Sequence, residues 1–175
     1  MIYLRLMLLT TIAMLLAGCS DEPAASSQAN KPTDSRPAWL LVSEPTPALS
    51  VDEAKASAKE GDRIVLRGRI GGRKEPMSAA SPVLTMMDTG VPHCADNPDD
   101  KCATPWDYCC VPKDQIAAHS ATVQIVGEDG SHTGINLKAG GLSELDEIVV
   151  EGVVGPRPSE QVLTIRATGV YRLPQ

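Results

Sequence analysis

Alternating apolar and polar positions predict a mainly β domain in the second half of the chain. From residue 62 the apolar side chains recur at every second position, as in a strand with one buried face. Gly68 falls on that face, where it indicates a bulge or a sharp bend. The strands predicted by these patterns are residues 62–70, 82–88, 121–126, 147–154 and 161–171, with 133–138 as a sixth after the turn signal Asp129-Gly130.

One short helix is predicted before the first strand. Ser50 and Glu53 have the spacing of a capping box, in which each side chain accepts a hydrogen bond from the other residue's backbone. Residues 54–59 are good helix formers, and Gly61 stops them. We therefore expect about two helical turns leading into the first strand.

The segment before this helix is rich in proline and small polar residues, which cannot bury enough apolar surface to fold. We divide the chain into a leader (1–18), a tether (19–49) and a domain (50–175). An apolar island, Trp39 to Val42, interrupts the tether. It is expected to dock on the domain as a first strand or strap, and a partner-binding peptide is the alternative.

The leader has a positive start at Arg5 and an apolar core of about a dozen residues, too short for a bilayer span. Its end, Leu15-Leu16-Ala17-Gly18-Cys19, resembles a bacterial lipobox. This resemblance implies that residues 1–18 are removed and that Cys19 carries the lipid anchor. The protein would then be membrane-anchored in the bacterial cell envelope and face the periplasm. Ser20 favours the outer membrane, and an ordinary signal peptide is the alternative.

Composition narrows the classes of function. The formal net charge is −6, and loss of the leader with Arg5 makes it −7, which argues against a general polyanion binder. Phenylalanine is absent, so the core must be built from Val, Ile, Leu, Met and Ala. A small core with few large aromatics favours additional cross-links.

Five or six short strands with little helix predict a small β-barrel or sandwich. Residues 61–70 resemble the opening strand of an OB-fold, and residues 146–154 followed by 163–167 resemble its closing hairpin. The resemblance covers residues 61–172. It implies an OB-fold-like barrel of five to six strands with a cysteine-rich loop insertion, and it assigns no function.

The predicted loop 89–120 carries the unusual chemistry, concentrated in residues 93–110, the cysteine loop. Pro105-Trp106-Asp107-Tyr108-Cys109-Cys110, with Gly68 to Arg73, resembles an uncharacterised family of bacterial lipoproteins with no known activity. In an exported chain the four remaining cysteines are expected to form two disulfides. Adjacent cysteines rarely pair. Two pairings stay open: Cys94–Cys109 with Cys102–Cys110, or Cys94–Cys110 with Cys102–Cys109.

A metal site is the alternative for this loop. Thiolates of Cys94, Cys102, Cys109 and Cys110, with His93 and also His119, would suit zinc or copper. The loop has no Cys-x-x-Cys pair, which strong zinc sites usually show. Thiol redox exchange is a third hypothesis for the same sulfurs.

Two further sets of residues are candidates for recognition. Trp106 and Tyr108 lie in the cysteine loop, where they either pack over it or form a binding platform. Arg63, Arg67 and Arg69 share one face of the first strand. They are expected to pair across strands with Glu147 or Glu151. No aromatic interleaves them for base stacking, so nucleic acid is disfavoured as a partner.

Sequence motifs of common enzyme classes are missing: there is no nucleophile elbow, phosphate loop, dinucleotide glycine pattern or His-Glu-x-x-His helix. The sequence therefore predicts a lipid-anchored, non-catalytic binding or scaffold module without a cofactor. Its expected partner is an envelope protein or an anionic glycan. The alternative function is a metal-binding or thiol-redox lipoprotein that uses the cysteine loop.

Overall fold

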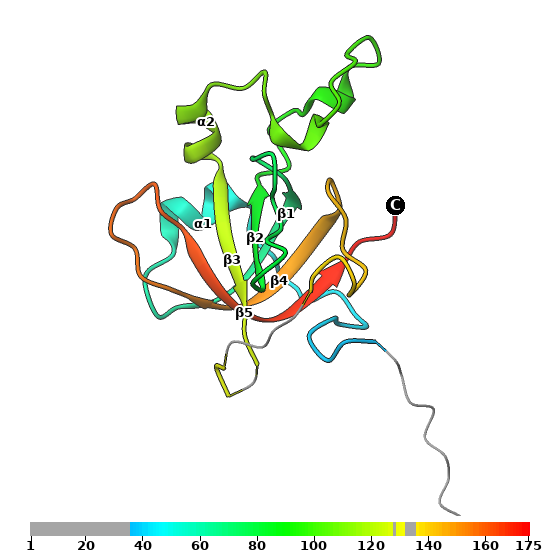
Figure 1. The fold of residues 1–175 in the computed structure, drawn as a ribbon. Helices are drawn as coiled ribbons and strands as arrows, with labels where there is room; N and C mark the ends of the chain where they lie inside the picture. The colour runs from blue at the N-terminus through cyan, green and yellow to red at the C-terminus, as the bar shows by residue number, and fades with distance from the viewer. Residues whose placement is uncertain (1–35, 128, 132–135) are drawn as a thin grey trace, which may run out of the picture. The chain divides into compact units, whose positions relative to one another are not determined.

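Strand alternation in the sequence becomes a closed five-stranded barrel in the structure, a computed structural model that describes residues 36–127, 129–131 and 136–175. The strands follow one another around the barrel in the order β1-β2-β3-β5-β4 (Figure 1). β3 and β5 pair in parallel and the other neighbours are antiparallel. The predicted OB-fold-like barrel is therefore confirmed. Its strands are β1 (Arg63–Ile70), β2 (Val83–Met87), β3 (Ser120–Ile125), β4 (Glu147–Val154) and β5 (Thr164–Arg172).

The barrel interior is filled by aliphatic side chains, as the absence of phenylalanine requires. In β1 the inward face predicted from the period of two is buried and the arginine face is more exposed. Each strand contributes alternate residues to one continuous core. The largest of these buried barrel side chains include Leu66, Ile70, Leu84, Met86, Ile125, Ile148 and Ile165.

Two glycines let the strands coil tightly enough to close the barrel. A Cβ on Gly68 would lie 2.5 Å from Cε of Met86 and 2.7 Å from the Met87 carbonyl oxygen. A Cβ on Gly152 would collide with the carbonyl oxygen of Arg166, at the point where the β4–β5 register shifts. The bend predicted at Gly68 is thus a close approach between β1 and β2.

The predicted capping box is confirmed at the start of α1 (Val51–Ser57). Ser50 Oγ accepts from the Glu53 backbone N–H at 3.2 Å, and Glu53 Oε2 accepts from Ser50 N–H at 2.8 Å. Val51 and Ala54 are buried and seat the helix on the barrel. The amphipathic face of this short helix is stabilised mainly by that packing.

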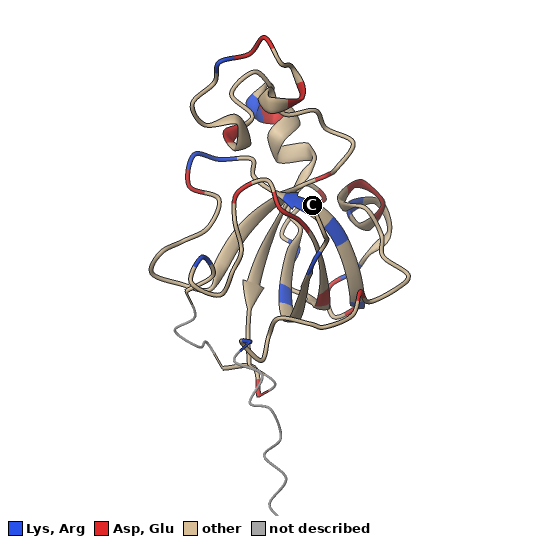
Figure 2. Ribbon diagram, turned by 90° about the vertical axis from the view of Figure 1, so that its right-hand side faces the viewer, with Lys and Arg blue, Asp and Glu red and all other residues tan. Residues whose placement is uncertain are grey.

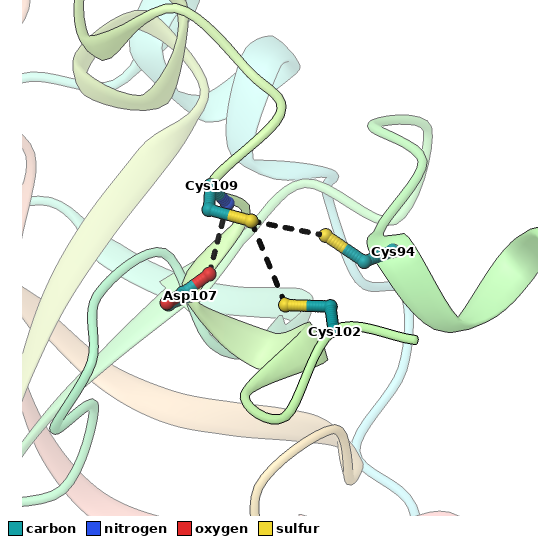
Figure 3. A group of neighbouring side chains, drawn as sticks. All are labelled: Cys94, Cys102, Asp107 and Cys109. Atoms are coloured by element: carbon teal, nitrogen blue, oxygen red, sulfur yellow. Dashed lines mark hydrogen bonds between the residues drawn. The ribbon is translucent and has the colours of Figure 1, made fainter. Parts of the chain in front are cut away.

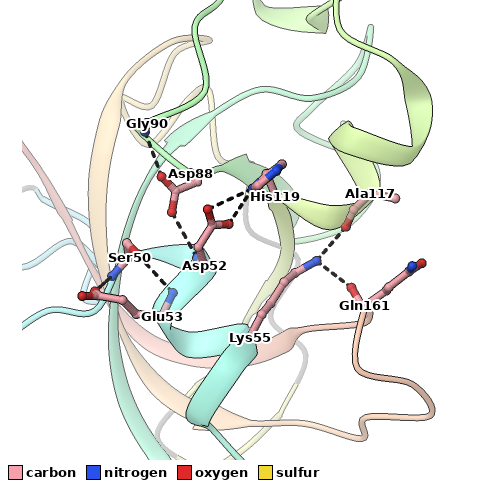
Figure 4. Close-up of polar contacts among 9 residues, drawn as sticks. All are labelled: Ser50, Asp52, Glu53, Lys55, Asp88, Gly90, Ala117, His119 and Gln161. Atoms are coloured by element: carbon pink, nitrogen blue, oxygen red, sulfur yellow. Dashed lines mark hydrogen bonds and ion pairs between the residues drawn. The ribbon is translucent and has the colours of Figure 1, made fainter.

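A second helix, α2 (Lys113–Ala118), was not predicted and stands against α1 through polar contacts (Figure 4). Lys55 Nζ donates to the carbonyl oxygens of Ala117 and Gln161, both at 2.6 Å. Burial lowers the pKa of Lys55. His119 Nδ1 lies 2.7 Å from Asp52 Oδ1, which links the end of α2 to the start of α1.

The apolar island of the tether forms a strap on the barrel. Trp39 is buried, Leu41 N–H donates to the Val170 carbonyl at 2.8 Å, and Val170 N–H donates to the Trp39 carbonyl at 2.8 Å. The chain therefore contacts the barrel ahead of residue 50. The leader, Cys19 and the tether up to residue 35 lie outside the described residues, so their assignments stay predictions.

Half of the predicted strand 133–138, residues 133–135, lies outside the described residues, and residues 137–141 form turns. In the described ranges no helix is both long and apolar enough to span a bilayer.

The close approach at Gly152 gives a test of the barrel. Gly152→Ala should lower the free energy of unfolding by about 2–4 kcal/mol, because its methyl group meets β5 backbone atoms that cannot move away. Gly155→Ala is the matched control, since its Cβ would make ordinary contacts of 3.5 Å with Thr164. Urea titration followed by circular dichroism measures both, and equal stability of the two variants would contradict this account of barrel closure.

Candidate metal centre

The cysteine loop is anchored to the end of β1 by backbone contacts that leave no room for side chains. Gly72 N–H donates to the Trp106 carbonyl at 2.8 Å. A Cβ on Gly71 would stand 2.7 Å from that same carbonyl oxygen and 2.7 Å from Cε2 of Tyr108. Tyr108 is fully buried and has a left-handed backbone with φ of 58°. The pair of glycines therefore lets the loop pack directly on the barrel.

Two Asp-x-Cys turns orient two of the cysteines. The Asp100 carboxylate accepts from the backbone N–H of Cys102, and the Asp107 carboxylate accepts from that of Cys109, both at 2.9 Å. Asp107 also accepts from Thr104 Oγ1 at 2.7 Å, which fixes its other oxygen. These are Asx turns, in which a side chain replaces a backbone acceptor. The repeated spacing is a sequence signal that the sequence analysis missed.

The sulfurs converge as a result (Figure 3). Cys109 Sγ lies 3.6 Å from Cys94 Sγ and 3.6 Å from Cys102 Sγ. Cys110 Sγ lies 3.9 Å from the sulfurs of Cys94 and Cys109. Cys94 is buried, Cys102 is partly buried, and Cys109 and Cys110 are exposed.

These spacings differ from the disulfides expected from the sequence. A disulfide needs sulfurs about 2.05 Å apart, and the four cysteines are free thiols in the structure. Neither predicted pairing is formed, although Cys94–Cys109 and Cys94–Cys110 are both close pairs. The physical reason is that three sulfurs share one centre, with Cys109 equidistant from two others.

The same spacings fit ligands around a metal ion. Sulfurs bound to zinc at about 2.3 Å stand about 3.8 Å apart when they occupy corners of a tetrahedron. The sulfurs of Cys94, Cys102 and Cys109 and a carboxylate oxygen of Asp107 all lie within 4.8 Å of one another. A second set within that limit joins Cys94 and Cys110 to Asp100. The geometry therefore offers more donors than the four that zinc requires.

Without a cation, this crowding favours protonated thiols. Burial raises the pKa of Cys94, and the neighbouring thiols of Cys102, Cys94 and Cys110 raise the pKa of Cys109 well above its usual range. Several thiolates this close together repel each other strongly. A bound metal would reverse this preference, because metal binding displaces the thiol protons.

Neither histidine joins the sulfurs. His93 Nε2 lies 3.3 Å from Asp96, and its ring meets that of Tyr108 edge to face at 6.1 Å. Burial, and next Arg69, lower the pKa of His93. His119 belongs to the contacts between α1 and α2, paired with Asp52 (Figure 4). The ligand set expected for a metal is thus reduced to cysteines and aspartates among the described residues.

The three arginines on the outer face of β1 make different contacts. Arg67 and Arg69 each place Nη2 at 2.9 Å from a carboxylate oxygen of Glu147, the cross-strand pairing expected from the sequence. Arg63 lines a groove of about 650 Å³ beside Val153. Figure 2 shows basic and acidic segments interleaved over the barrel and the cysteine loop. This pattern is that of a mixed surface and does not form a basic stripe.

The two aromatics of the loop have different roles. Tyr108 packs beneath the loop and burial raises its pKa. Trp106 is partly buried, and its Nε1 donates to the Lys74 carbonyl at 3.0 Å. Its ring lines a cleft of about 490 Å³ whose charged side chains are Lys74, Glu75, Lys138 and Glu144. Tyr108 is therefore a packing residue, whereas Trp106 lines a cleft that a ligand could enter.

The comparisons with known proteins define no family for this barrel and cysteine centre. No family model matches the chain, and no curated protein sequence matches it. Among solved structures it is similar to the hypothetical protein ygiW from E. coli, with a TM-score of 0.38 and 13% identity. The match covers 73% of this chain and 91% of that one. The lipoprotein family suggested by the Pro-Trp-Asp-Tyr-Cys-Cys segment stays a prediction.

The Glu147 pair beneath the loop predicts a pH dependence of stability. Hydrogen bonds from Arg67, and then Arg69, lower the pKa of Glu147 against an opposing effect of burial. A carboxylate whose pKa is lower in the folded protein than in the unfolded chain stabilises the fold. This stabilisation is complete above the unfolded-state pKa of about 4.3 and is lost as the pH falls through the folded-state pKa. Glu147→Gln should therefore lower the free energy of unfolding by about 1 kcal/mol at pH 7, and by progressively less as the pH falls below about 4.3.

Urea unfolding at several pH values measures this difference. Glu151→Gln is the control, because Glu151 lies on the same strand without an ion pair among the described residues. A Glu147→Gln effect that stays constant from pH 7 to the acid range would contradict the proposed role of the carboxylate charge.

Proposed function

We propose that this protein is a non-catalytic binding module of the bacterial cell envelope that holds one zinc ion in its cysteine loop. The observation that carries the proposal is the spacing of 3.6 Å from Cys109 Sγ to the sulfurs of Cys94 and Cys102. It is far longer than a disulfide bond and close to the edge of a zinc–sulfur tetrahedron. Cys94, Cys102 and Cys109 would hold the ion, and Asp107 or Cys110 would complete the shell.

Zinc suits this donor set better than copper does. Thiolates bind both ions, but a carboxylate oxygen within 4.8 Å of three sulfurs is a harder donor, which favours zinc. Zinc has no redox chemistry of its own, so the bound ion would not itself oxidise the thiolates. A four-sulfur shell with Cys110 in place of Asp107 would also suit zinc, and copper(I) is the other ion that such a shell would accept.

Thiol redox exchange is less well supported by the same geometry. The attacking species in that reaction is the thiolate. The raised pKa of Cys94 and Cys109 keeps those sulfurs protonated near neutral pH when no cation is present. Those two sulfurs are therefore poor nucleophiles, and a cation is the natural stabiliser of their deprotonated form.

The cellular address is part of the proposal and rests on the sequence. Acylation at Cys19 would anchor the mature chain to the membrane, with the outer membrane favoured by Ser20. The barrel would then present the cysteine loop to the periplasm. An envelope protein or a glycan is the partner that the cleft beside Trp106 would accept. Its two lysines and two glutamates balance in charge, so an anionic glycan has no advantage there.

Metal content is the direct test. The full chain, purified without chelators, should carry one equivalent of zinc, and Cys94, Cys102 and Cys109 should resist thiol reagents until a chelator and denaturant are added together. Cobalt substituted for zinc should give the intense visible bands of a tetrahedral thiolate site. Cys94→Ser should lose stoichiometric metal, because Cys94 is the buried sulfur that belongs to both donor sets.

His119→Gln is the control for this measurement, since His119 lies with α1 and not with the sulfurs. It should bind metal as the parent protein does. A metal-free protein whose four loop cysteines form two disulfides when it is isolated from the periplasm would overturn the proposal.

Membrane attachment is tested separately. Cys19→Ser should abolish incorporation of labelled palmitate and block removal of the leader, because the thiol is the site of acylation. Metal binding by the Cys19→Ser protein should be unchanged. Labelling that persists in Cys19→Ser would show that the anchor lies elsewhere.

A further inference from the structure

The donors around the sulfur cluster outnumber the places on a zinc ion, and they are not equivalent. Cys94, Cys102 and Cys109 form one set with Asp107. Cys110 belongs to the other set, in which Cys94 is the shared member. Cys110 Sγ lies 3.9 Å from the sulfurs of Cys94 and Cys109, whereas Cys109 Sγ lies 3.6 Å from those of Cys94 and Cys102. Three sulfurs are therefore fixed donors and a fourth place is contested.

The three fixed cysteines are each held by local backbone structure. Cys94 begins the 3-10 helix η1 (Cys94–Asp96) and is buried. Backbone N–H groups of Cys102 and Cys109 are fixed by the two Asx turns. Cys110 has no such turn, and it is exposed. Apart from its contacts with the neighbouring sulfurs, its sulfur makes a weak contact with Asp100 Oδ2 at 4.0 Å.

The alternative fourth donor, Asp107, is committed to other contacts. One of its oxygens accepts from Cys109 N–H and the other from Thr104 Oγ1. A carboxylate so engaged would bind zinc weakly, through its remaining lone pairs. The contested place is thus filled by either a constrained carboxylate or a loosely held, exposed thiolate.

We infer that the fourth place is an exchange position and that the protein hands its metal to an incoming thiol or imidazole. This inference rests on the proposed zinc site. In the exchange step the sulfur of the incoming thiol bonds to zinc while the zinc–Cys110 bond breaks. The proton of the incoming thiol passes to the released Cys110 thiolate, and no electron is transferred. Structural zinc sites are closed, whereas sites with an accessible position admit an external ligand.

The acceptor is therefore a soft donor group that can approach the exposed side of the loop. Cys109 is also exposed, so a second incoming donor could displace it after Cys110. Cys94 would be the last sulfur to leave, because burial restricts access to it. The order in which the sulfurs leave zinc therefore follows their exposure, with the most exposed leaving first.

Alkylation of the zinc-loaded full chain tests this order. A short pulse of iodoacetamide followed by peptide mass spectrometry should label Cys110 first, with Cys94, Cys102 and Cys109 protected. Cys110→Ser should keep one equivalent of zinc and lose no more than about tenfold in affinity. Cys102→Ser is the matched comparison, and it should lose stoichiometric zinc.

Transfer kinetics supply a second readout. With dimercaptosuccinate as the acceptor, the rate of zinc loss should rise in proportion to acceptor concentration, as a direct exchange requires. Equal protection of all four sulfurs, or a rate independent of acceptor concentration, would overturn the inference and leave the zinc site standing. A protein that binds no zinc would instead refute the proposed function itself.

Discussion

The mutual repulsion of closely spaced thiolates is the constraint on which the candidate site depends. Cys94, Cys102 and Cys109 lie within 4.8 Å of one another, and crowding raises the pKa of Cys109. A cation at the centre of the cluster would therefore favour its deprotonated form. Structural zinc sites in small domains provide an apparent ~10–16 kcal/mol of binding free energy, enough to order a loop that has few apolar residues. A bound ion would stabilise the loop, as the hydrophobic core stabilises the barrel.

The barrel contributes rigidity to this arrangement. Closure around five strands fixes the end of β1, and the Gly71-Gly72 pair lets the loop backbone pack against it. Tyr108 fills the space beneath the loop. Because the loop is pinned at its base, the barrel itself fixes part of the loop backbone that carries the sulfurs. Preorganisation of this kind raises affinity by reducing the conformational cost of binding.

The sequence predicted the barrel well because its strands repeat a period of two over several residues. Residues 147–154 match β4 at both ends, and the capping box placed the start of α1 correctly. Helix α2 was missed because it has six residues, begins after Pro112 and has no side-chain cap. Neither propensity nor periodicity identifies so short a helix; its contacts with α1 stabilise it.

The candidate site was predicted in part. The sequence brought the four cysteines into one loop, but it favoured disulfides over a shared centre. The spacing of the sulfurs depends on the loop backbone at Cys102 and Cys109, which hydrogen bonds to the carboxylates of Asp100 and Asp107 hold in place. Those hydrogen bonds are local and could have been inferred from the two Asp-x-Cys spacings. The docking at Gly71 depends on tertiary contacts and could not.

X-ray absorption at the zinc edge of the purified full chain tests the central claim most directly. The account predicts a first shell dominated by sulfur at about 2.3 Å, with at least three sulfurs for each zinc. A shell of nitrogen and oxygen alone, or a protein free of zinc with sulfur–sulfur bonds in the loop, would contradict it.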